Sequence, residues 1–77
     1  MTPDEDIDAR GLLCPLPVLK ARKALLRMAP GQVLRIAATD RASVIDMPHF
    51  CAQTGHEYLG ATEERGALVH LIRCGAV

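Results

Sequence analysis

The sequence predicts a two-layer α/β sandwich whose elements run in the order strand, helix, strand, helix, strand, strand. A stripe of apolar residues at helical spacing within residues 15–29 predicts the first helix. Apolar and polar residues alternate in 33–39, as in a strand with one buried face. A turn signal at 63–66 separates two further strand-like segments, 56–62 and 68–74. Strand–helix–strand units imply parallel pairing with right-handed crossovers, and two helices suffice to cover one face of a small sheet.

The first helix is expected to follow a short strand at about residues 7–9. It spans about residues 15–29, and Pro30-Gly31 ends it. Its apolar stripe consists of Val18, Ala21, Leu25 and Met28. In the strand that follows, one face carries Leu34, Ile36 and Ala38, and the other carries Arg35.

Pro48 is expected to interrupt the second helical region, because proline is unfavourable in a helix interior. Asp40 is a plausible cap for a short or kinked first segment that runs to about Met47. Asp46 can cap the helix anew, which would place Pro48 in its first turn. Gly55 is a suitable C-terminal stop for this helix.

The length of 77 residues indicates one domain over 1–77, with residues 1–5 expected to be frayed. The hydrophobic fraction of 49% is almost entirely aliphatic, which suits a compact core and argues against disorder. No apolar run reaches the length of a membrane span, and the polar, acidic start of the chain is unlike a secretory signal. We therefore expect a cytoplasmic monomer that does not bind membranes.

Cys14-Pro15-Leu16-Pro17 is the most informative motif of the chain. The residue before a proline avoids helical geometry, and proline suits the first helical turn, so Cys14 is expected to be the N-cap and Pro15 the first helical residue. The nearest donor to the sulfur would be the Leu16 N–H, since Pro17 has none. A thiol at a helix N-terminus is expected to have a pKa below its usual value of about 8.5. The alternative interpretation is a small buried cysteine that precedes a helix.

The other cysteines and the histidines give weaker signals. The cysteines number three and include no Cys-x-x-Cys pair, which disfavours a disulfide scaffold, and no metal site is predicted. Cys51 lies in an apolar stretch and is interpreted as core, whereas Cys74, near the C-terminus, is a candidate for exposure. The three histidines are interpreted as surface or strand-face residues, since the sequence shows no acid–base partner for any of them.

The formal net charge is zero, but the basic residues are concentrated around the first helix, and no acidic residue occurs between Asp8 and Asp40. The candidates for partner binding are Arg10, Leu13, Lys20, Arg22, Lys23 and Arg27. The basic ones either form an ordinary solvated face or steer an acidic protein partner. Arg22 falls inside the apolar arc of the helix, where its stem packs while its head reaches either water or a partner. Direct nucleic-acid binding is not expected, because the charges balance and no aromatic platform for bases is present.

Three different blocks of the sequence, which together span residues 7–75, make up one pattern. The first is the run 8–18 with its Cys-Pro-x-Pro motif, followed by Arg22-Lys23-Ala24-Leu25. The second is 40–51, and the third is Leu71-Ile72-Arg73 followed by Gly75. The pattern resembles the TusA-type (SirA-like) sulfur-carrier family. The resemblance implies a mixed four-stranded sheet of order 1-2-4-3, with strand four antiparallel and both helices on one face.

The resemblance also implies that Cys14 carries sulfur as a persulfide, because only Cys14 occupies the position of the family's cysteine. Pro15, Leu16 and Pro17 would support this cysteine at the helix cap. An apolar docking rim would be formed by Leu12, Leu13 and Leu16. The sulfur would come from a cysteine desulfurase or a rhodanese-like donor and pass to an acceptor protein by thiol–disulfide exchange chemistry.

We interpret the protein as a sulfurtransferase-type carrier rather than a true enzyme, with no cofactor besides the covalent persulfide sulfur. The pathway of the acceptor stays open among tRNA thiolation, molybdenum-cofactor metabolism and sulfur oxidation. Two other interpretations are compatible with the sequence. One is a small regulatory or structural module in which Cys14 is buried, and the other is an RNA-binding module of the same layer architecture.

Overall fold

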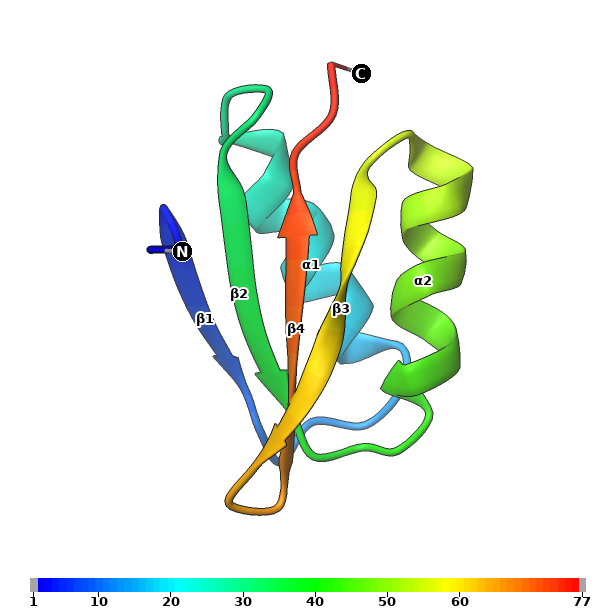
Figure 1. The fold of residues 1–77 in the computed structure, drawn as a ribbon. Helices are drawn as coiled ribbons and strands as arrows, with labels where there is room; N and C mark the ends of the chain where they lie inside the picture. Colours follow the sequence, from blue (N-terminus) through cyan, green and yellow to red (C-terminus); the bar gives the residue numbers. More distant parts are fainter. Residues whose placement is uncertain (1, 77) are drawn as a thin grey trace.

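The computed structural model describes residues 2–76 and places four strands in one sheet beside two helices (Figure 1). The strands are β1 (Glu5–Ala9), β2 (Val33–Ala38), β3 (Glu57–Glu64) and β4 (Ala67–Arg73), and the helices are α1 (Leu16–Leu26) and α2 (Ser43–Thr54). The order in the sheet is β1-β2-β4-β3, so the last strand of the chain lies between the second and the third. The predicted α/β fold, its βαβαββ element order and the strand order 1-2-4-3 are confirmed.

The pairing of the strands follows from their connections. β1 pairs parallel with β2, as a strand–helix–strand crossover requires, and Ile7 lies opposite Ile36. β4 pairs antiparallel with both β2 and β3, and His70 is the partner of Ile36 on the other side. The register of β3 against β4 shifts between Tyr58 and Gly60, where one strand carries an extra residue.

Both helices pack on the same core with one face of the sheet, and Figure 1 shows α1 behind the strands and α2 beside β3. α1 packs on β1 and β2, and α2 packs on β3 and β4. On β2 the buried side chains of this face are Leu34, Ile36 and Ala38, as the alternating pattern predicted. Met47 of α2 and Ile72 of β4 are also fully buried. Burial of each large apolar side chain contributes ~1.5–3 kcal/mol, which makes this layer the main source of stability.

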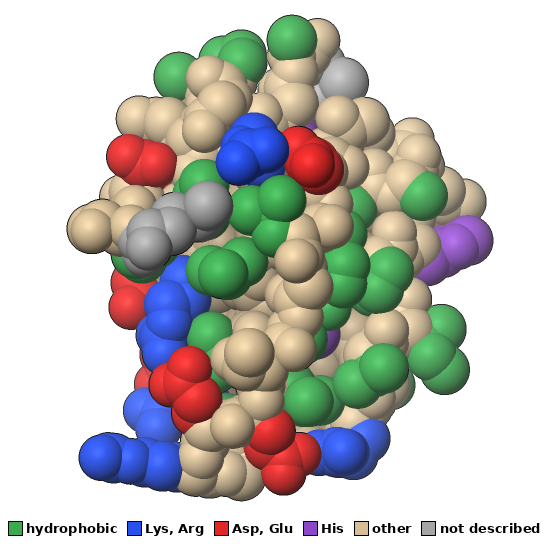
Figure 2. All heavy atoms as spheres, in the orientation of Figure 1, with side chains coloured by type: hydrophobic (Ala, Val, Ile, Leu, Met, Phe, Trp, Pro, Cys, Tyr) green, Lys and Arg blue, Asp and Glu red, His purple; other side chains and the backbone are tan. Residues whose placement is uncertain are grey.

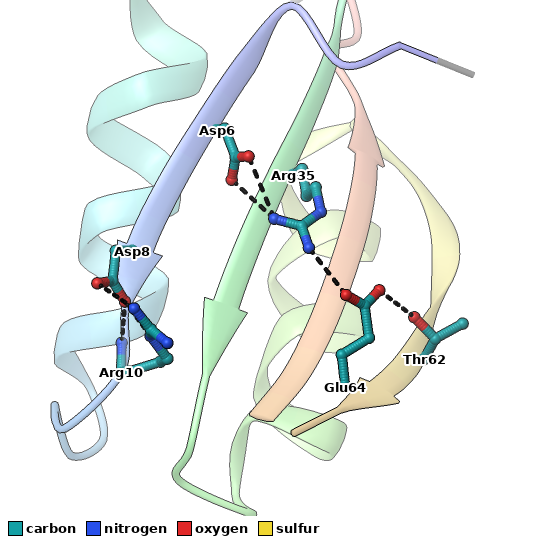
Figure 3. Close-up of polar contacts among 6 residues, drawn as sticks. All are labelled: Asp6, Asp8, Arg10, Arg35, Thr62 and Glu64. Carbon is teal, nitrogen blue, oxygen red and sulfur yellow. Dashed lines mark hydrogen bonds and ion pairs between the residues drawn. The ribbon is translucent and has the colours of Figure 1, made fainter. Parts of the chain in front are cut away.

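The opposite face of the sheet carries a polar network that reaches from β1 to β3 (Figure 3). Nη1 of Arg35 donates to both carboxylate oxygens of Asp6 at 3.1 Å, and its Nη2 donates to Oε1 of Glu64 at 3.1 Å. The Thr62 hydroxyl donates to Oε2 of Glu64 at 3.4 Å. Figure 2, in the orientation of Figure 1, shows apolar side chains beside acidic and basic ones on this face. Exposed ion pairs of this kind contribute only about 0–1 kcal/mol each.

The start of the chain is more ordered than the sequence suggested. β1 begins at Glu5, before the predicted strand at residues 7–9. The Asp4 N–H donates to the Val33 carbonyl at 2.8 Å, and Oδ2 of Asp4 accepts from the Val33 N–H at 2.8 Å. Asp4 and Glu5 are therefore held to the sheet, against the expectation that residues 1–5 are frayed, while Met1 lies outside the described residues.

α1 is shorter than predicted and ends at Leu26 instead of about Ala29. The Arg27 N–H donates to the Ala24 carbonyl at 3.1 Å, and the Met28 N–H donates to the Leu25 carbonyl at 3.2 Å. These bonds to the third residue back tighten the last turn and stop the regular helix.

The interruption expected at Pro48 is wrong, because α2 is one continuous helix with Pro48 inside it. A proline in a helix removes one N–H bond and crowds the preceding turn. The helix persists because tertiary packing outweighs this local cost: Met47, Phe50 and Cys51 around the proline are all buried. Asp46 lies in the first turn of α2 and does not recap it.

Of the two predicted ends of α2, only the C-terminal one is confirmed, because the N-cap is Ala42 and no side chain caps the helix there. Asp40 instead closes the turn before the helix: its Oδ1 accepts from the Ala42 N–H at 3.0 Å, and its carbonyl accepts from the Ser43 N–H at 3.1 Å. Gly55 ends the helix in the left-handed region, with a φ of 81°.

The predicted hairpin is confirmed, with a shorter turn than the four residues suggested. Arg65 and Gly66 form the turn, with φ values of 51° and 80°, and Glu64 pairs with Ala67 beside it. Two consecutive positive φ values are the geometry of a two-residue type I′ hairpin turn.

Candidate functional site

Cys14 lies exposed in the loop between β1 and α1. α1 begins at Leu16, so Pro15 is the N-cap residue and Pro17 the second helical residue. Cys14 is therefore one residue further from the helix than the predicted N-cap. Its peptide bond to Pro15 is cis. Pro17 is buried against the body of the protein, whereas Pro15 and Leu16 are exposed beside the sulfur.

The amide expected to stabilise the sulfur is used elsewhere. The Leu16 N–H donates to the Leu13 carbonyl at 2.8 Å, which closes a turn around Cys14. The prediction that this N–H bonds the sulfur is wrong, because the loop satisfies it with backbone.

The loop that carries Cys14 is fastened to the loop between β2 and α2. The Cys14 N–H donates to Oδ2 of Asp40 at 2.7 Å, and the Gly11 N–H donates to Oγ1 of Thr39 at 2.9 Å. Asp40 also accepts from the Ala42 N–H, and these backbone hydrogen bonds lower the pKa of its carboxyl. A charged Asp40 thus joins the cysteine loop to the start of α2.

A shallow pocket of about 260 Å³ opens beside Cys14, between α1 and α2. Its lining consists of Cys14, Pro15, Val18, Asp46, His49, Phe50 and Gln53. Most of these residues belong to α2, which the sequence analysis did not connect with the cysteine. The pocket combines an apolar floor with one carboxylate and one imidazole.

The pKa of Cys14 is raised, and the predicted lowering is wrong. The largest cause is hydrogen bonding between the thiol and the Asp46 carboxylate, followed by loss of hydration and by the negative charges of Asp46 and Asp40. Nearby negative charge disfavours a thiolate. The helix N-terminus of α1 therefore does not set the acidity of this cysteine, because the fold brings two carboxylates of the α2 region next to it.

The predicted partner-binding residues lie around this loop and along α1, and all six are exposed. Two of the cations have acidic partners within the chain: Arg10 pairs with Asp8 at 2.9 Å, and Arg27 pairs with Glu5 at 2.8 Å. The Arg10 pair lowers the pKa of Asp8 to about 2. A shallow hollow of about 300 Å³ on α1 is lined by Ile7, Lys20, Lys23 and Arg27.

Exposed apolar side chains occur next to Cys14 in the chain and at the start of α2. Leu13 is 70% exposed and Leu16 is 48% exposed, as expected of a docking rim, while Leu12 is half-buried and packs against the core. α2 adds Val44 and Ile45 in its first turn, and Ile45 is 74% exposed. Sequence reasoning missed these two, although they directly precede Asp46.

The other two cysteines are buried. Burial raises the pKa of Cys51 to about 11, which confirms its interpretation as core. Cys74 is only 5% exposed, and its Sγ lies 3.6 Å from the Leu25 carbonyl and 3.7 Å from the Met28 carbonyl. The expected exposure of Cys74 is therefore wrong, because its backbone pairs with Gln32 just before β2 and its sulfur packs under the end of α1. Cys14 is the one exposed thiol.

His70 was missed as a buried polar residue. Its Nδ1 lies 2.8 Å from the Tyr58 hydroxyl, and its Nε2 lies 2.9 Å from Oγ of Ser43. Burial lowers the pKa of His70, so the ring is held neutral. The signal in the sequence was the position of His70 between Leu68 and Ile72 on the inner face of β4. Through Ser43 this network holds the first residue of α2, the helix that carries Asp46.

Residues 2–76 contain neither a cluster of metal-binding side chains nor a helix that could span a membrane. No three His, Cys, Asp or Glu side chains lie close enough together to hold a metal ion. No helix in this range is long and apolar enough to cross a bilayer.

The fold and the site define a class: a small α/β protein that presents one exposed cysteine from the loop between a strand and a proline-flanked helix. Comparisons with known proteins agree. The profile of the family described as "Sulfurtransferase TusA" matches residues 5–74. The sulfur carrier protein TusA of Allochromatium vinosum is 49% identical over 70 residues, which are 91% of this chain and 92% of that protein. TusA of Pseudomonas entomophila is 44% identical over 70 residues, 91% of this chain and 88% of that one.

A solved structure shares the architecture as well. The SirA-like protein from Desulfitobacterium hafniense superimposes with a TM-score of 0.75 at 30% sequence identity, over 92% of this chain and 97% of that chain. The chain belongs to the TusA family of sulfur carrier proteins. The resemblance seen in the sequence blocks is confirmed.

Proposed function

We propose that Cys14 accepts one sulfane sulfur as a persulfide from a cysteine desulfurase or a rhodanese-like donor and relays it to an acceptor protein. The observation that carries this proposal is the exposure of Cys14 in a Cys-Pro-x-Pro loop, while Cys51 and Cys74 are buried. Exposure also opposes the alternative in which Cys14 is a structural core residue. Membership of the TusA family gives the class of cargo, and the donor and acceptor are part of the proposal.

The chemistry requires an accessible sulfur and the absence of a second thiol that could resolve the persulfide. Attack by the Cys14 sulfur on the outer sulfur of a donor persulfide breaks the donor S–S bond, and the donor leaves as a thiolate. A neighbouring free thiol would attack the new persulfide and form a disulfide. The burial of Cys51 and Cys74 avoids this side reaction.

The surroundings of Cys14 suit a protein donor. Leu13 and Leu16 offer exposed apolar contact beside Cys14 in the loop, and the cationic side of α1 would attract an acidic partner surface. The proposed contact residues are Arg10, Leu13, Lys20, Arg22, Lys23 and Arg27. Arg10 and Arg27 are already paired with carboxylates, so Lys20, Arg22 and Lys23 should contribute most to steering.

The acceptor belongs to a sulfur-relay pathway, and tRNA thiolation, molybdenum-cofactor metabolism and sulfur oxidation are the candidate destinations. Delivery to each requires the same step at Cys14, so the acceptor is distinguished by its docking surface. Incubation of the loaded carrier with purified acceptors of the three kinds would rank them by rate of unloading.

Intact mass spectrometry tests the loading step. The protein is incubated with a cysteine desulfurase and cysteine, and the mass should increase by one sulfur atom. Cys14→Ser should remain unloaded, whereas a variant with Cys51→Ala and Cys74→Ala should load like the wild type. Normal loading of folded Cys14→Ser, or no loading of the wild type by either donor class, would overturn the proposal.

A further inference from the structure

Asp46 is the one carboxylate in the pocket beside Cys14. It is half-buried, and the pocket places it among Val18, Phe50 and the thiol. None of the ion pairs in the described part of the chain involves it. An acidic side chain that shares a pocket with a nucleophilic sulfur and is not paired with a cation is free to act on that sulfur.

The backbone on both sides holds this pair of groups in place. Asp40 accepts the Cys14 N–H at 2.7 Å, so the cysteine loop is tied to the residues just before α2. Ser43 in the first turn of α2 is tied to buried His70 at 2.9 Å. The thiol and the carboxylate therefore belong to one rigid corner of the fold, as a proton-transfer pair requires.

The other titratable groups near the sulfur are Asp40 and His49. Both oxygens of Asp40 already accept backbone N–H bonds, from Cys14 and Ala42, which keeps Asp40 charged and occupied. His49 lines the same pocket but is exposed. Asp46 lines the same pocket as the thiol and raises the pKa of Cys14, so the resting protein holds a protonated sulfur that must lose its proton during transfer.

We propose that Asp46 is a catalytic residue of sulfur transfer, which takes the Cys14 proton during loading. The proposal rests on the proposed function. In loading, the Cys14 sulfur bonds to the outer sulfur of the donor persulfide, and the donor S–S bond breaks. Its electron pair leaves with the inner donor sulfur as a thiolate, and the Cys14 proton passes to the Asp46 carboxylate.

Unloading restores the Cys14 thiol. The acceptor thiolate attacks the outer sulfur of the Cys14 persulfide, and the Cys14 S–S bond breaks. The Cys14 sulfur leaves with the electron pair and takes a proton from water. Sulfane sulfur moves between thiols in both steps, so no external oxidant or reductant is needed.

Asp46→Asn separates this role from a purely electrostatic one. Loss of the negative charge should lower the pH at which Cys14 is alkylated by iodoacetamide, because the thiolate becomes easier to form. Loading from glutathione persulfide at neutral pH should nevertheless slow by about tenfold or more, because general-base assistance is lost. Asp6→Asn, which removes an exposed carboxylate on the opposite face of the sheet, is the matched control for both measurements.

The outcomes are distinct. Faster loading of Asp46→Asn, in step with its larger thiolate fraction, would overturn the proposal and leave Asp46 as a charge that restrains the thiol. A large loss of loading in His49→Gln, with Asp46→Asn unaffected, would overturn it in favour of the imidazole. Asp46→Glu should restore part of the loading rate that Asp46→Asn loses. If the wild type itself takes no sulfur from any persulfide, the proposed function fails instead.

Discussion

Replacement of Ser43 by alanine should destabilise the fold by removing a partner of a fully buried histidine. His70 is 0% exposed, and its two ring nitrogens contact Ser43 at 2.9 Å and Tyr58 at 2.8 Å. In Ser43→Ala the Nε2 atom loses its partner where water has no access, and such a group costs ~1–3 kcal/mol. Alanine is a better helix former than serine by roughly 0.5 kcal/mol. The net loss should therefore be about 0.5–2.5 kcal/mol.

Thermal unfolding followed by circular dichroism measures this loss. For a domain of this size, 1 kcal/mol corresponds to roughly 4–8 °C in Tm, so the Tm should fall by about 2–20 °C. Tyr58→Phe is the matched comparison, because Tyr58 is only half-buried and water can replace its hydroxyl in part. Its loss should be smaller. A Ser43→Ala protein as stable as the wild type, or one less affected than Tyr58→Phe, would refute the reasoning.

Three further predictions concern acidity and docking. Burial lowers the pKa of His70, so as the pH falls His70 binds a proton in the unfolded chain before it does so in the folded chain. The free energy of unfolding should therefore fall as the pH drops below about 6.5 toward the pKa of His70 in the folded chain. Urea titrations across this range should show the fall, and His70→Gln should reduce its slope. The alkylation rate of Cys14 should have its inflection above the usual value of about 8.5, and an inflection at or below that value would contradict the influence of the nearby carboxylates. Lys20→Glu combined with Lys23→Glu should slow loading from a desulfurase at low salt, with the defect shrinking as salt is added, whereas unchanged rates would assign both lysines to a solvated face.

Local patterns were sufficient to predict the elements of the fold. The alternation in β2 identified which side chains are buried, and Arg65-Gly66 lies at the predicted turn. The strand order came from the family resemblance, since the pairing of β4 with β2 is not encoded in a local pattern. The helix break predicted at Pro48 is wrong because the local cost of a proline in a helix is visible in sequence, whereas the packing of Met47 and Phe50 that outweighs this cost is not.

Of the candidate site, the sequence identified only the exposed cysteine. Cys14 could be found because its prolines are adjacent in sequence. The acidity of Cys14 was predicted with the wrong sign, since Asp46 and Asp40 come from a distant segment that only the folded chain brings to the thiol. The exposure of Cys74 was predicted wrongly for a related reason: its position at the end of a strand is visible in sequence, but the packing of its sulfur under the end of α1 is not.

The burial of Cys51 and Cys74 gives this chain a practical property. A maleimide reagent meets one accessible thiol on each folded molecule, so a maleimide-coated resin or electrode would attach every copy through Cys14 and in the same orientation. Unfolding would release the other two thiols to the same reagent. The number of labels per chain, read by mass spectrometry, would therefore count folded and unfolded molecules without any engineered probe.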